Sequence, residues 1–376
     1  MKKIAVIGST GSIGRQTLEV IRRHSDKFSV VSLAGGNNSK LFLEQVKEFK
    51  PRVATIKNRI EDLPSGTEYY FGENAYVNAV IEEADVVVVA LVGYSGIHAV
   101  LECIKKGKTI ALANKESLVV GGSLVMKLAK EKGVKILPVD SEHSAIWQAL
   151  SFDFNKPFSK IILTASGGAF RDFSIEELKE VKAKDALRHP NWLMGDKITV
   201  DCATMVNKAF EVIEARWLYN ASFDKIETLI HRESIVHSMV EFTDGSVMAQ
   251  MGVPSMELPI QLALTYPERF NSGVERLDLK KIASLTFREV DDKKYPCFKL
   301  ITECAKQGGI LPAVANGANE RAVELFLKDQ IKYTDIYLAI NNALDKVENK
   351  PLKEEADFIE AKRLGVESVN KLFGVN

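Results

Sequence analysis

Two acidic residues near the middle of the chain, Asp140 and Glu142, have the types and the spacing of a metal site. They follow an apolar run in the stretch ILPVDSEHSAIWQAL, and residues two apart on an extended segment point the same way. Two hard oxygen donors on one side suit Mg²⁺ or Mn²⁺. The alternative is a helix N-terminus, where Asp140 or Ser141 would cap the next helix and Glu142 would interact with its dipole. These residues alone favour neither interpretation.

A second polar group lies in DCATMVNKAFEVIEARWLY. Asn207, Lys208 and Glu211 are at positions i, i+1 and i+4, so they share one face of a helix that is otherwise rich in apolar residues. Glu211 could add a third carboxylate to a metal site while Asn207 and Lys208 bind an anionic substrate. A solvated stripe with a weak ion pair is the structural alternative.

The chain begins with a short strand-like run followed by GSTGSIG, Gly8 to Gly14. Glycines there allow a tight turn, and free N–H groups at the start of the next helix can hold a pyrophosphate. Because the turn stands between a strand and a helix, we expect a dinucleotide site. About 20 residues beyond, where NAD enzymes usually carry an acidic residue, the sequence has Ala34 to Asn38, which favours NADP over NAD.

Three other segments supply polar groups near strand ends. TASGGAF could offer Ser166 and backbone N–H groups to a phosphate, or be an ordinary turn. NKES places Lys115 on the edge where such folds bind ligands, where it could pair with a substrate or be solvated. HPNWLMG could form a lid over the site, with a core role for Trp192 as the alternative.

The elements that position these residues follow a clear order. Residues 1–140 alternate β-branched runs with helical segments, which predicts an α/β fold with a Rossmann-like, doubly wound parallel sheet. This part includes a helix between the run at 52–56 and Ala84. Residues 141–266 predict a central α+β catalytic domain with strands near 160–164, 226–230, 235–242 and 247–251. Residues 267–294 have no sustained period and predict a linker, and residues 295–376 predict a C-terminal helical bundle.

Composition restricts the class of protein. The 376 residues carry 50 basic and 50 acidic side chains, so binding to nucleic acid or to an anionic membrane has little support. The four cysteines have no CxxC spacing, which indicates thiols in a reducing compartment. The longest apolar run, Val86 to Val92, is too short to span a membrane, and the stretch from Met1 to Gly8 is too short for the apolar region of a signal peptide. We therefore predict a cytoplasmic protein whose partners are small molecules or copies of itself.

Taken in order, GSTGSIG, ANKES, VDSEH, ASGGAF, HPNW with MG after it, and NKAFEVIEARWL resemble the 1-deoxy-D-xylulose 5-phosphate reductoisomerase family. The resemblance runs from the first strand to at least Phe270, and the helical end of the chain resembles that family's third domain. It implies NADPH-dependent conversion of 1-deoxy-D-xylulose 5-phosphate to 2-C-methyl-D-erythritol 4-phosphate in the non-mevalonate isoprenoid pathway. It also implies a divalent cation, Mg²⁺ or Mn²⁺, and a homodimer.

The resemblance also implies residue roles. The metal ligands would be Asp140, Glu142 and Glu211, and the catalytic set would add Lys115 and His189. The substrate would contact Lys115, Ser141, Glu142, Ser166, His189, Trp192, Met194, Cys202, Asn207, Lys208 and Glu211. NADPH would contact Thr10, Gly11, Ser12, Ile13, Gly36, Asn37, Asn38, Asn114, Glu116 and Gly195.

Two positions depart from the family pattern. Cys202 stands where the pattern has a phosphate-binding serine, and a thiol is a weaker hydrogen-bond donor than a hydroxyl. Asn37 stands where some members have a lysine that could neutralise the 2′-phosphate of NADPH. Lys40 is a candidate to supply the missing positive charge. Weaker phosphate binding and softer selectivity for NADPH over NADH are therefore expected.

Two other functions remain as alternatives. A semialdehyde-type dehydrogenase would need a nucleophilic cysteine with a histidine partner. Cys202 is the candidate by position, but the neighbouring Asp201 would raise the pKa of its thiol. A non-catalytic dinucleotide-sensing protein would have no use for three carboxylates beside Lys208.

Overall fold

The computed structural model describes residues 1–188 and 194–375. The chain forms two compact units, each made from separate stretches of sequence. The first unit holds residues 1–117, 125–144 and 255–275, and the second holds residues 118–124, 145–254 and those from 276 onward. The predicted division at residues 140, 266 and 294 remains a prediction.

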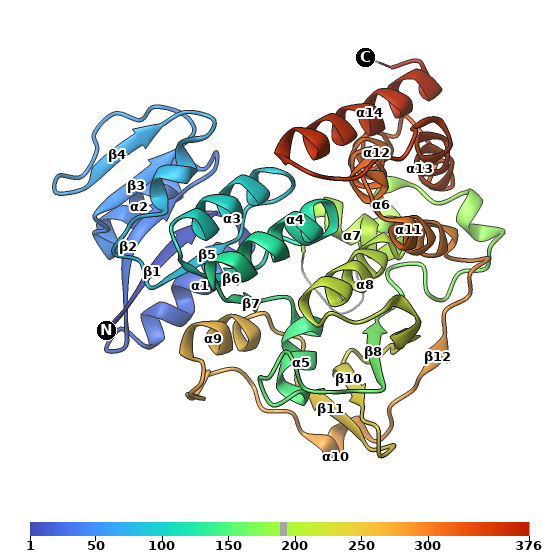
Figure 1. The fold of residues 1–376 in the computed structure, drawn as a ribbon, viewed down its shortest axis with the longest axis horizontal. Helices are drawn as coiled ribbons and strands as arrows, with labels where there is room; N and C mark the ends of the chain where they lie inside the picture. The colour runs from blue at the N-terminus through green and yellow to red at the C-terminus, as the bar shows by residue number, and fades with distance from the viewer. Residues whose placement is uncertain (189–193, 376) are drawn as a thin grey trace. The chain divides into compact units, whose positions relative to one another are not determined.

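In its described residues, the first unit is built on a parallel sheet of seven strands in the order β4-β3-β2-β1-β5-β6-β7 (Figure 1). The chain runs outward from β1 to β4, returns to the middle at β5, and runs outward again to β7. This reversal confirms the predicted doubly wound α/β fold. The strands are β1 (Lys2–Ile7), β2 (Phe28–Ala34), β3 (Val53–Ile56), β4 (Glu68–Phe71), β5 (Val86–Val89), β6 (Thr109–Leu112) and β7 (Ile136–Pro138).

Helices cover both faces of this sheet. Right-handed crossovers place α1 and α2 on one face and α3 on the other, because the direction of winding reverses at β5. The helix α9 contacts α1, β6 and β7, so it lies on the same face as α1. The helices are α1 (Ser12–Arg23), α2 (Ser39–Phe49), α3 (Ser95–Lys105), α4 (Glu116–Lys132) and α9 (Glu257–Thr265).

The predicted helix between β3 and β5 is wrong. This stretch holds β4 and a short 3₁₀ helix, η1 (Ala75–Ala79). The sequence EYYF of β4 alternates exposed and half-buried residues, and its aromatic residues favour an edge strand. Pro64 and Gly66 interrupt the chain before β4, which leaves no room for a long helix.

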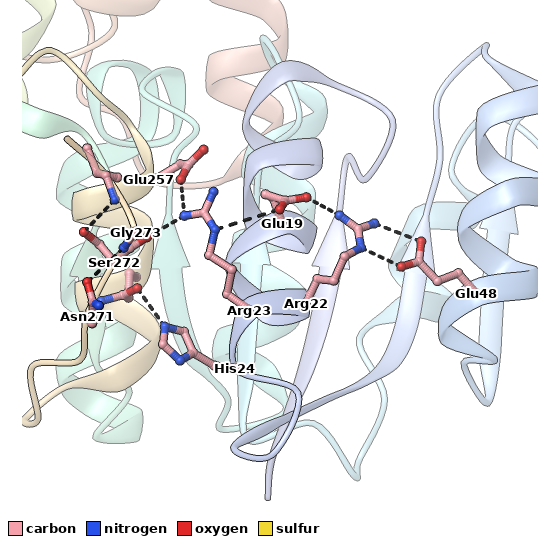
Figure 2. Close-up of polar contacts among 11 residues, drawn as sticks. Glu19, Arg22, Arg23, His24, Glu48, Glu257, Asn271, Ser272 and Gly273 are labelled. Atoms are coloured by element: carbon pink, nitrogen blue, oxygen red, sulfur yellow. Dashed lines mark hydrogen bonds and ion pairs between the residues drawn. The ribbon is translucent and has the colours of Figure 1, made fainter.

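Ion pairs and hydrogen bonds attach residues 255–275 to α1 (Figure 2). The guanidinium of Arg23 pairs with Glu257 and donates to the carbonyl of Ser272 over 2.5 Å. The ring of His24 is 3.0 Å from the side-chain oxygen of Gln261. On the other side of α1, Arg22 forms a bidentate pair with Glu48 of α2 at 2.7 and 2.9 Å. These contacts explain why this late segment belongs to the first unit.

The second unit contains a mixed sheet, whose described strands follow the order β11-β10-β8-β9-β12. β8 and β9 are parallel, and the other pairs are antiparallel. β12 is a two-residue strand inside the predicted linker, where pairing with β9 rather than any sequence pattern creates it. The strands are β8 (Lys160–Ala165), β9 (Ile226–Ile230), β10 (Val236–Glu241), β11 (Val247–Met251) and β12 (Arg288–Glu289).

The C-terminal part of the second unit is helical, as predicted (Figure 1). α12 packs against both α13 and α14. A Cβ atom at Gly365 of α14 would lie 2.4 Å from the carbonyl oxygen of Val314 in α12, so glycine permits this close approach. These helices are α11 (Pro296–Gln307), α12 (Leu311–Leu327), α13 (Asp335–Lys346) and α14 (Glu355–Phe373).

Shorter helices complete the second unit. They are η2 (Glu177–Lys179), α6 (Ala183–Ala186), α7 (Asp196–Ala203), α8 (Val206–Leu218), η3 (Phe223–Lys225) and α10 (Leu279–Ile282), and α5 (Ser141–Ala149) follows β7. Among the residues that the structure describes, no helix combines the length and the apolar character needed to cross a bilayer.

Candidate functional site

The glycine-rich turn between β1 and α1 has the backbone geometry of a phosphate cradle. Gly8 has a φ of +96°, a conformation that favours glycine. A Cβ atom at Gly14 would lie 2.1 Å from the carbonyl oxygen of Gly8, so only glycine fits there. The N–H groups of Gly8 and Ser9 donate to the carbonyl of Ala34 at 2.9 and 2.8 Å. The turn is thereby fixed to the end of β2, and the first N–H groups of α1 have no acceptor within the helix.

The segment after β2 lies against the same turn. The hydroxyl of Thr10 accepts from the N–H of Gly36 over 3.0 Å. Asn38 caps α2 by accepting from the N–H of Leu41 over 3.1 Å, while Asn37 is exposed. The structure therefore brings together two of the predicted NADPH-binding segments, 10–13 and 36–38.

Gln45 supports the turn from α2, although it belongs to none of the predicted motifs. Its amide donates to the carbonyl of Ser9 over 2.9 Å, and the side chain is buried. A glutamine on the apolar face of an amphipathic helix is the signal that could have found it, because a buried polar group needs a hydrogen-bond partner.

Asn114 holds the loop after β5. Its side-chain amide donates to the carbonyls of Leu91 and Gly93 at 3.0 and 2.9 Å and to the carboxylate of Glu116 at 3.0 Å. Its side-chain oxygen accepts from the N–H of Ser117 over 2.9 Å. Asn114 and Glu116, both predicted to contact NADPH, therefore form one buried polar group at the start of α4.

Lys115 points to Asp140, and their charged atoms are 2.5 Å apart. The two side chains are 12% and 20% exposed, so water screens this pair less than a surface pair. Of the two conformations considered for residues 140–142, the extended segment is wrong and the helix N-terminus is confirmed, because α5 begins at Ser141. Asp140 caps this helix by accepting from the N–H of Glu142 over 3.1 Å, and the hydroxyl of Ser141 donates to Glu142 over 2.5 Å.

The two charged residues of the polar group on α8 are buried and Asn207 is half-buried, so the solvated stripe is wrong. Lys208 is 5% exposed and Glu211 is 1% exposed. The carboxylate of Glu211 accepts from the amide of Asn207 over 2.6 Å and pairs with the ammonium of Lys208. Burial of charged groups is costly unless they are paired. A pair in this position therefore indicates a role beyond the stability of the helix.

The turn after β8 approaches the end of α7. Gly167 and Gly168 have φ values of +81° and +70°, which glycine adopts without strain. A Cβ atom at Gly168 would lie 2.4 Å from the carbonyl oxygen of Cys202. The half-buried residues Ser166 and Cys202, both predicted to bind the substrate phosphate, thus lie on two segments in direct contact.

This turn is held by residues that belong to none of the predicted motifs. The hydroxyl of Tyr295 donates to the carbonyl of Gly167 over 3.0 Å. Burial raises the pKa of Tyr295 to about 12, so the hydroxyl stays protonated as a donor. The guanidinium of Arg171 donates to the carbonyls of Ser166 and Arg232 at 3.4 and 3.0 Å. No local sequence signal marks these contacts, because the partners are up to 128 residues apart.

The C-terminal helices hold α7. The buried carboxylate of Asp201 accepts from the amide of Asn319 in α12 over 2.8 Å and pairs with Lys197 at 3.0 Å. The hydroxyl of Tyr333 donates to the carbonyl of Ala203 over 2.7 Å. Cys202 lies between these two anchored residues, so its position depends on the helical part of the second unit.

Four predicted site residues belong to the segment before α7. His189 and Trp192 lie outside the described residues. Met194 is half-buried, and Gly195 is the exposed N-cap of α7. The carbonyl of Gly195 accepts from the hydroxyl of Thr199 over 2.8 Å.

Three family models match the sequence. "1-Deoxy-D-xylulose 5-phosphate reductoisomerase" matches residues 4–122, the C-terminal domain model of the same name matches residues 136–219, and "DXP reductoisomerase C-terminal domain" matches residues 251–365. Among curated proteins, the 1-deoxy-D-xylulose 5-phosphate reductoisomerase of Pelotomaculum thermopropionicum is 47% identical over 99% of this chain and 100% of the relative. That of Clostridium perfringens is 49% identical over 89% of this chain and 90% of the relative.

Solved structures agree with these matches. The 1-deoxy-D-xylulose 5-phosphate reductoisomerase from Zymomonas mobilis in complex with NADPH is 38% identical, with a TM-score of 0.93 over 99% of each chain. A reductoisomerase in complex with NADPH, fosmidomycin and magnesium is also 38% identical, with a TM-score of 0.93 over 100% of this chain and 98% of the other.

Proposed function

Because the chain belongs to the 1-deoxy-D-xylulose 5-phosphate reductoisomerase family, we propose that it converts 1-deoxy-D-xylulose 5-phosphate to 2-C-methyl-D-erythritol 4-phosphate. The enzyme uses NADPH and a divalent cation, as the NADPH- and magnesium-bound relatives do. The reaction serves the non-mevalonate isoprenoid pathway. The observation on this chain that carries the proposal is the buried Lys208–Glu211 pair beside Asn207.

The first unit supplies the NADPH-binding residues. The turn from Thr10 to Ile13 holds the pyrophosphate through N–H groups at the start of α1. Asn37 and Asn38 would lie beside the adenosine ribose of NADPH. Because no acidic residue stands at this position, a 2′-phosphate is not repelled. When bound, NADPH supplies the hydride for the reductive step. Support comes from the close approach of Gly14 to Gly8 and from the bond between Gly36 and Thr10.

The metal ligands in this proposal are Asp140, Glu142 and Glu211. All three side chains carry carboxylates, which are the hard oxygen donors that Mg²⁺ and Mn²⁺ prefer. When bound, the cation acts as a Lewis acid and orients the substrate oxygens. Lys115 then neutralises part of the charge on Asp140.

The second unit binds the substrate phosphate. Ser166, Cys202, Asn207 and Lys208 supply hydroxyl, thiol, amide and ammonium donors, and Lys208 supplies the one full positive charge among them. Ser141, Met194, His189 and Trp192 complete the substrate contacts in this proposal. Support comes from the contact of the Ser166 turn with α7 and from the burial of Lys208, since a partly dry site strengthens the attraction between opposite charges.

The two alternative functions are not favoured. A semialdehyde dehydrogenase needs an activated thiol, but the carboxylate beside Cys202 belongs to Asp201, which bonds Asn319 and Lys197. A dinucleotide sensor gives no reason to keep a buried ion pair such as Lys208–Glu211. Relatives that cover nearly the whole chain carry the name of a reductoisomerase.

We also infer a homodimer formed through β11. This strand lies at the edge of its sheet, and its apolar side chains Val247, Met248 and Met251 are 47%, 54% and 37% exposed. An apolar edge strand invites pairing with another chain. A light-scattering mass of twice 41.7 kDa that falls to a single chain in Met248→Lys would support this, and a monomeric wild type would contradict it. All four cysteines are free thiols, which supports the proposed cytoplasmic location.

The test of the function is NADPH oxidation with 1-deoxy-D-xylulose 5-phosphate in the presence of Mg²⁺, Mn²⁺ or EDTA. We expect turnover with either cation and none with EDTA. Glu211→Gln should lower kcat/KM by more than about 100-fold, since a metal ligand is lost, without changing the Kd for NADPH. Asp224→Asn, an exposed carboxylate on η3, is the matched control and should behave as wild type.

Each negative result has a separate meaning. Absence of turnover with both cations would overturn the proposed function. Normal turnover in Glu211→Gln would overturn the ligand assignment alone. Weakened NADPH binding in that variant would show a general loss of structure instead.

A further inference from the structure

A small pocket lies in the second unit, behind the turn after β8. It has a volume of about 130 Å³, close to the roughly 150 Å³ of an engineered cavity that holds one benzene molecule. It therefore has room for one small ligand. It is lined by Arg171, Ile230, Arg232, Arg288, Glu289, Asp291, Lys294 and Tyr295.

The charges that line the pocket are mainly positive. Four basic residues face two acidic ones, and Asp291 already accepts from the N–H groups of Lys293 and Lys294 at 2.9 and 3.4 Å. Arg288 makes no side-chain hydrogen bond or ion pair with another residue in the described ranges. The pocket thus contains a guanidinium that is available to an anion.

Arg232 could also engage an anion. Both of its terminal nitrogens bind Asp172, at 2.7 and 2.9 Å, but the Asp172 side chain is 59% exposed. This bidentate geometry is the one in which an exposed ion pair contributes most, so a bound anion has to compete with the Asp172 carboxylate for Arg232.

One wall of the pocket is partly dry. Burial lowers the pKa of Lys294, and its ammonium donates to the carbonyl of Arg171 over 2.7 Å. Tyr295 is 4% exposed. Removal of water strengthens the attraction between the basic groups and an anion.

The pocket is connected to the proposed phosphate-binding turn. Arg171 donates to the carbonyl of Ser166, and Tyr295 donates to that of Gly167. The Arg171 bond is long, at 3.4 Å, and therefore weak. An anion that attracts the guanidinium of Arg171 would remove this support from the turn.

We propose that this pocket binds a small phosphate-bearing anion, and that its occupancy weakens substrate binding through Arg171 and the Ser166–Gly168 turn. Three guanidinium groups reach the pocket from separate segments, after β8, after β9 and on β12. Arginine forks match the oxygens of phosphate, and a tetrahedral anion offers oxygens in several directions. The regulatory part rests on the proposed function.

Binding is tested by equilibrium dialysis of radiolabelled inorganic phosphate against the full chain saturated with NADPH. The Lys208→Met background removes the proposed substrate phosphate site, so the remaining site is the pocket. In that background, Arg288→Gln should weaken phosphate binding by about fivefold or more, as loss of one charge-assisted bond predicts, and Arg288→Lys should retain most of it. Lys293→Gln, an exposed charge outside the pocket, is the control and should bind as its parent does.

Three binding results would overturn the proposal. They are no phosphate bound in Lys208→Met, unchanged affinity in Arg288→Gln, or an equal loss in Lys293→Gln. Citrate serves as a carboxylate probe. Displacement of phosphate by an equal concentration of citrate would overturn the proposal that the pocket binds phosphate-bearing anions. If Lys208→Met binds as many phosphates as wild type, the proposed role of Lys208 fails while the Arg288 comparison still tests the pocket.

Kinetics test the coupling. Phosphate should compete with substrate for the substrate site in every variant. Only a protein with an intact pocket should show the additional rise in KM that occupancy of the pocket causes. At the phosphate concentration that doubles KM in Arg288→Gln, KM in wild type should rise about fourfold, because coupling between two sites is a shared free energy. Equal increases in the two proteins would overturn the coupling.

Discussion

At the scale of single residues, burial distinguishes the ion pair of the proposed site from the ion pairs on the surface. Many lysine–glutamate pairs lie on this protein's surface, for example Lys306 with Glu303, whose side chains are 49% and 54% exposed. The Lys208–Glu211 pair has the same i, i+3 spacing, but its side chains are 6% and 2% exposed. A surface pair contributes little, whereas a buried pair is costly to keep. The sequence spacing is the same in both cases, so only the structure distinguishes them.

Cys202 gives a prediction at this scale. Cys202→Ser should lower KM for 1-deoxy-D-xylulose 5-phosphate by about twofold to tenfold, because a hydroxyl donates a stronger hydrogen bond worth roughly 0.5–1.5 kcal/mol. Steady-state kinetics at saturating NADPH measure this change. Cys202→Ala is the control and should not lower KM. Equal KM values in the serine and alanine variants would show that this side chain does not reach the phosphate.

At the scale of elements, close approach of backbones determines the shape of each turn. Gly14 of α1 lies against Gly8, and Gly168 lies against the end of α7. In both cases a methyl group would overlap with backbone atoms, which cannot move aside as a flexible side chain can. The close packing at both places therefore requires glycine, because any side chain would push the two backbones apart.

Gly14→Ala should raise the Kd for NADPH by more than about tenfold, equivalent to at least 1.4 kcal/mol. The added Cβ atom would force α1 away from the turn and misplace the N–H groups proposed to hold the pyrophosphate. Fluorescence titration with NADPH measures the effect. Glu19→Ala, one turn further along the same helix, is the control, and a Kd equal to wild type in Gly14→Ala would rule out this role for the turn.

At the scale of the whole molecule, both units are assembled from distant stretches of sequence. Residues 255–275 return to the first unit, where Arg23 at the end of α1 and the following His24 bind them (Figure 2). In the second unit, Tyr295, Asn319 and Tyr333 support segments more than 100 residues earlier. The two units are each discontinuous in sequence, so truncation of the C-terminal helices would remove anchors of the proposed phosphate-binding segments.

Buried thiols give a prediction for the folded chain as a whole. Burial raises the pKa of Cys297 and of Cys304 from 9.0 to about 12. The folded state thus prefers the protonated thiols, and their contribution to the free energy of unfolding is fully present below about pH 9. As the pH rises from 9 towards 12, each thiol should lower the free energy of unfolding by roughly 1.4 kcal/mol per pH unit.

Urea unfolding at increasing pH measures this loss, and stability that stays constant above pH 9 would contradict it. Iodoacetamide offers an independent check near neutral pH. The native protein should take up at most one label per chain, at the half-buried Cys202, while the unfolded chain takes up four. Rapid labelling of Cys297 or Cys304 in the native protein would show that these thiols are reachable.

Local patterns determined the parts of this protein that depend on neighbouring residues. The repeated strand and helix periods predicted the doubly wound sheet and the C-terminal helices, and the spacing of Asn207, Lys208 and Glu211 predicted their common helix face. The strand β4 and the two-residue strand β12 were missed, because edge pairing overrides weak local preferences. Tertiary structure alone decided which charges are buried, and it placed Arg171, Tyr295 and Asn319 behind the proposed site. Contacts between residues distant in sequence leave no periodic signal, since each depends on how separate elements pack together.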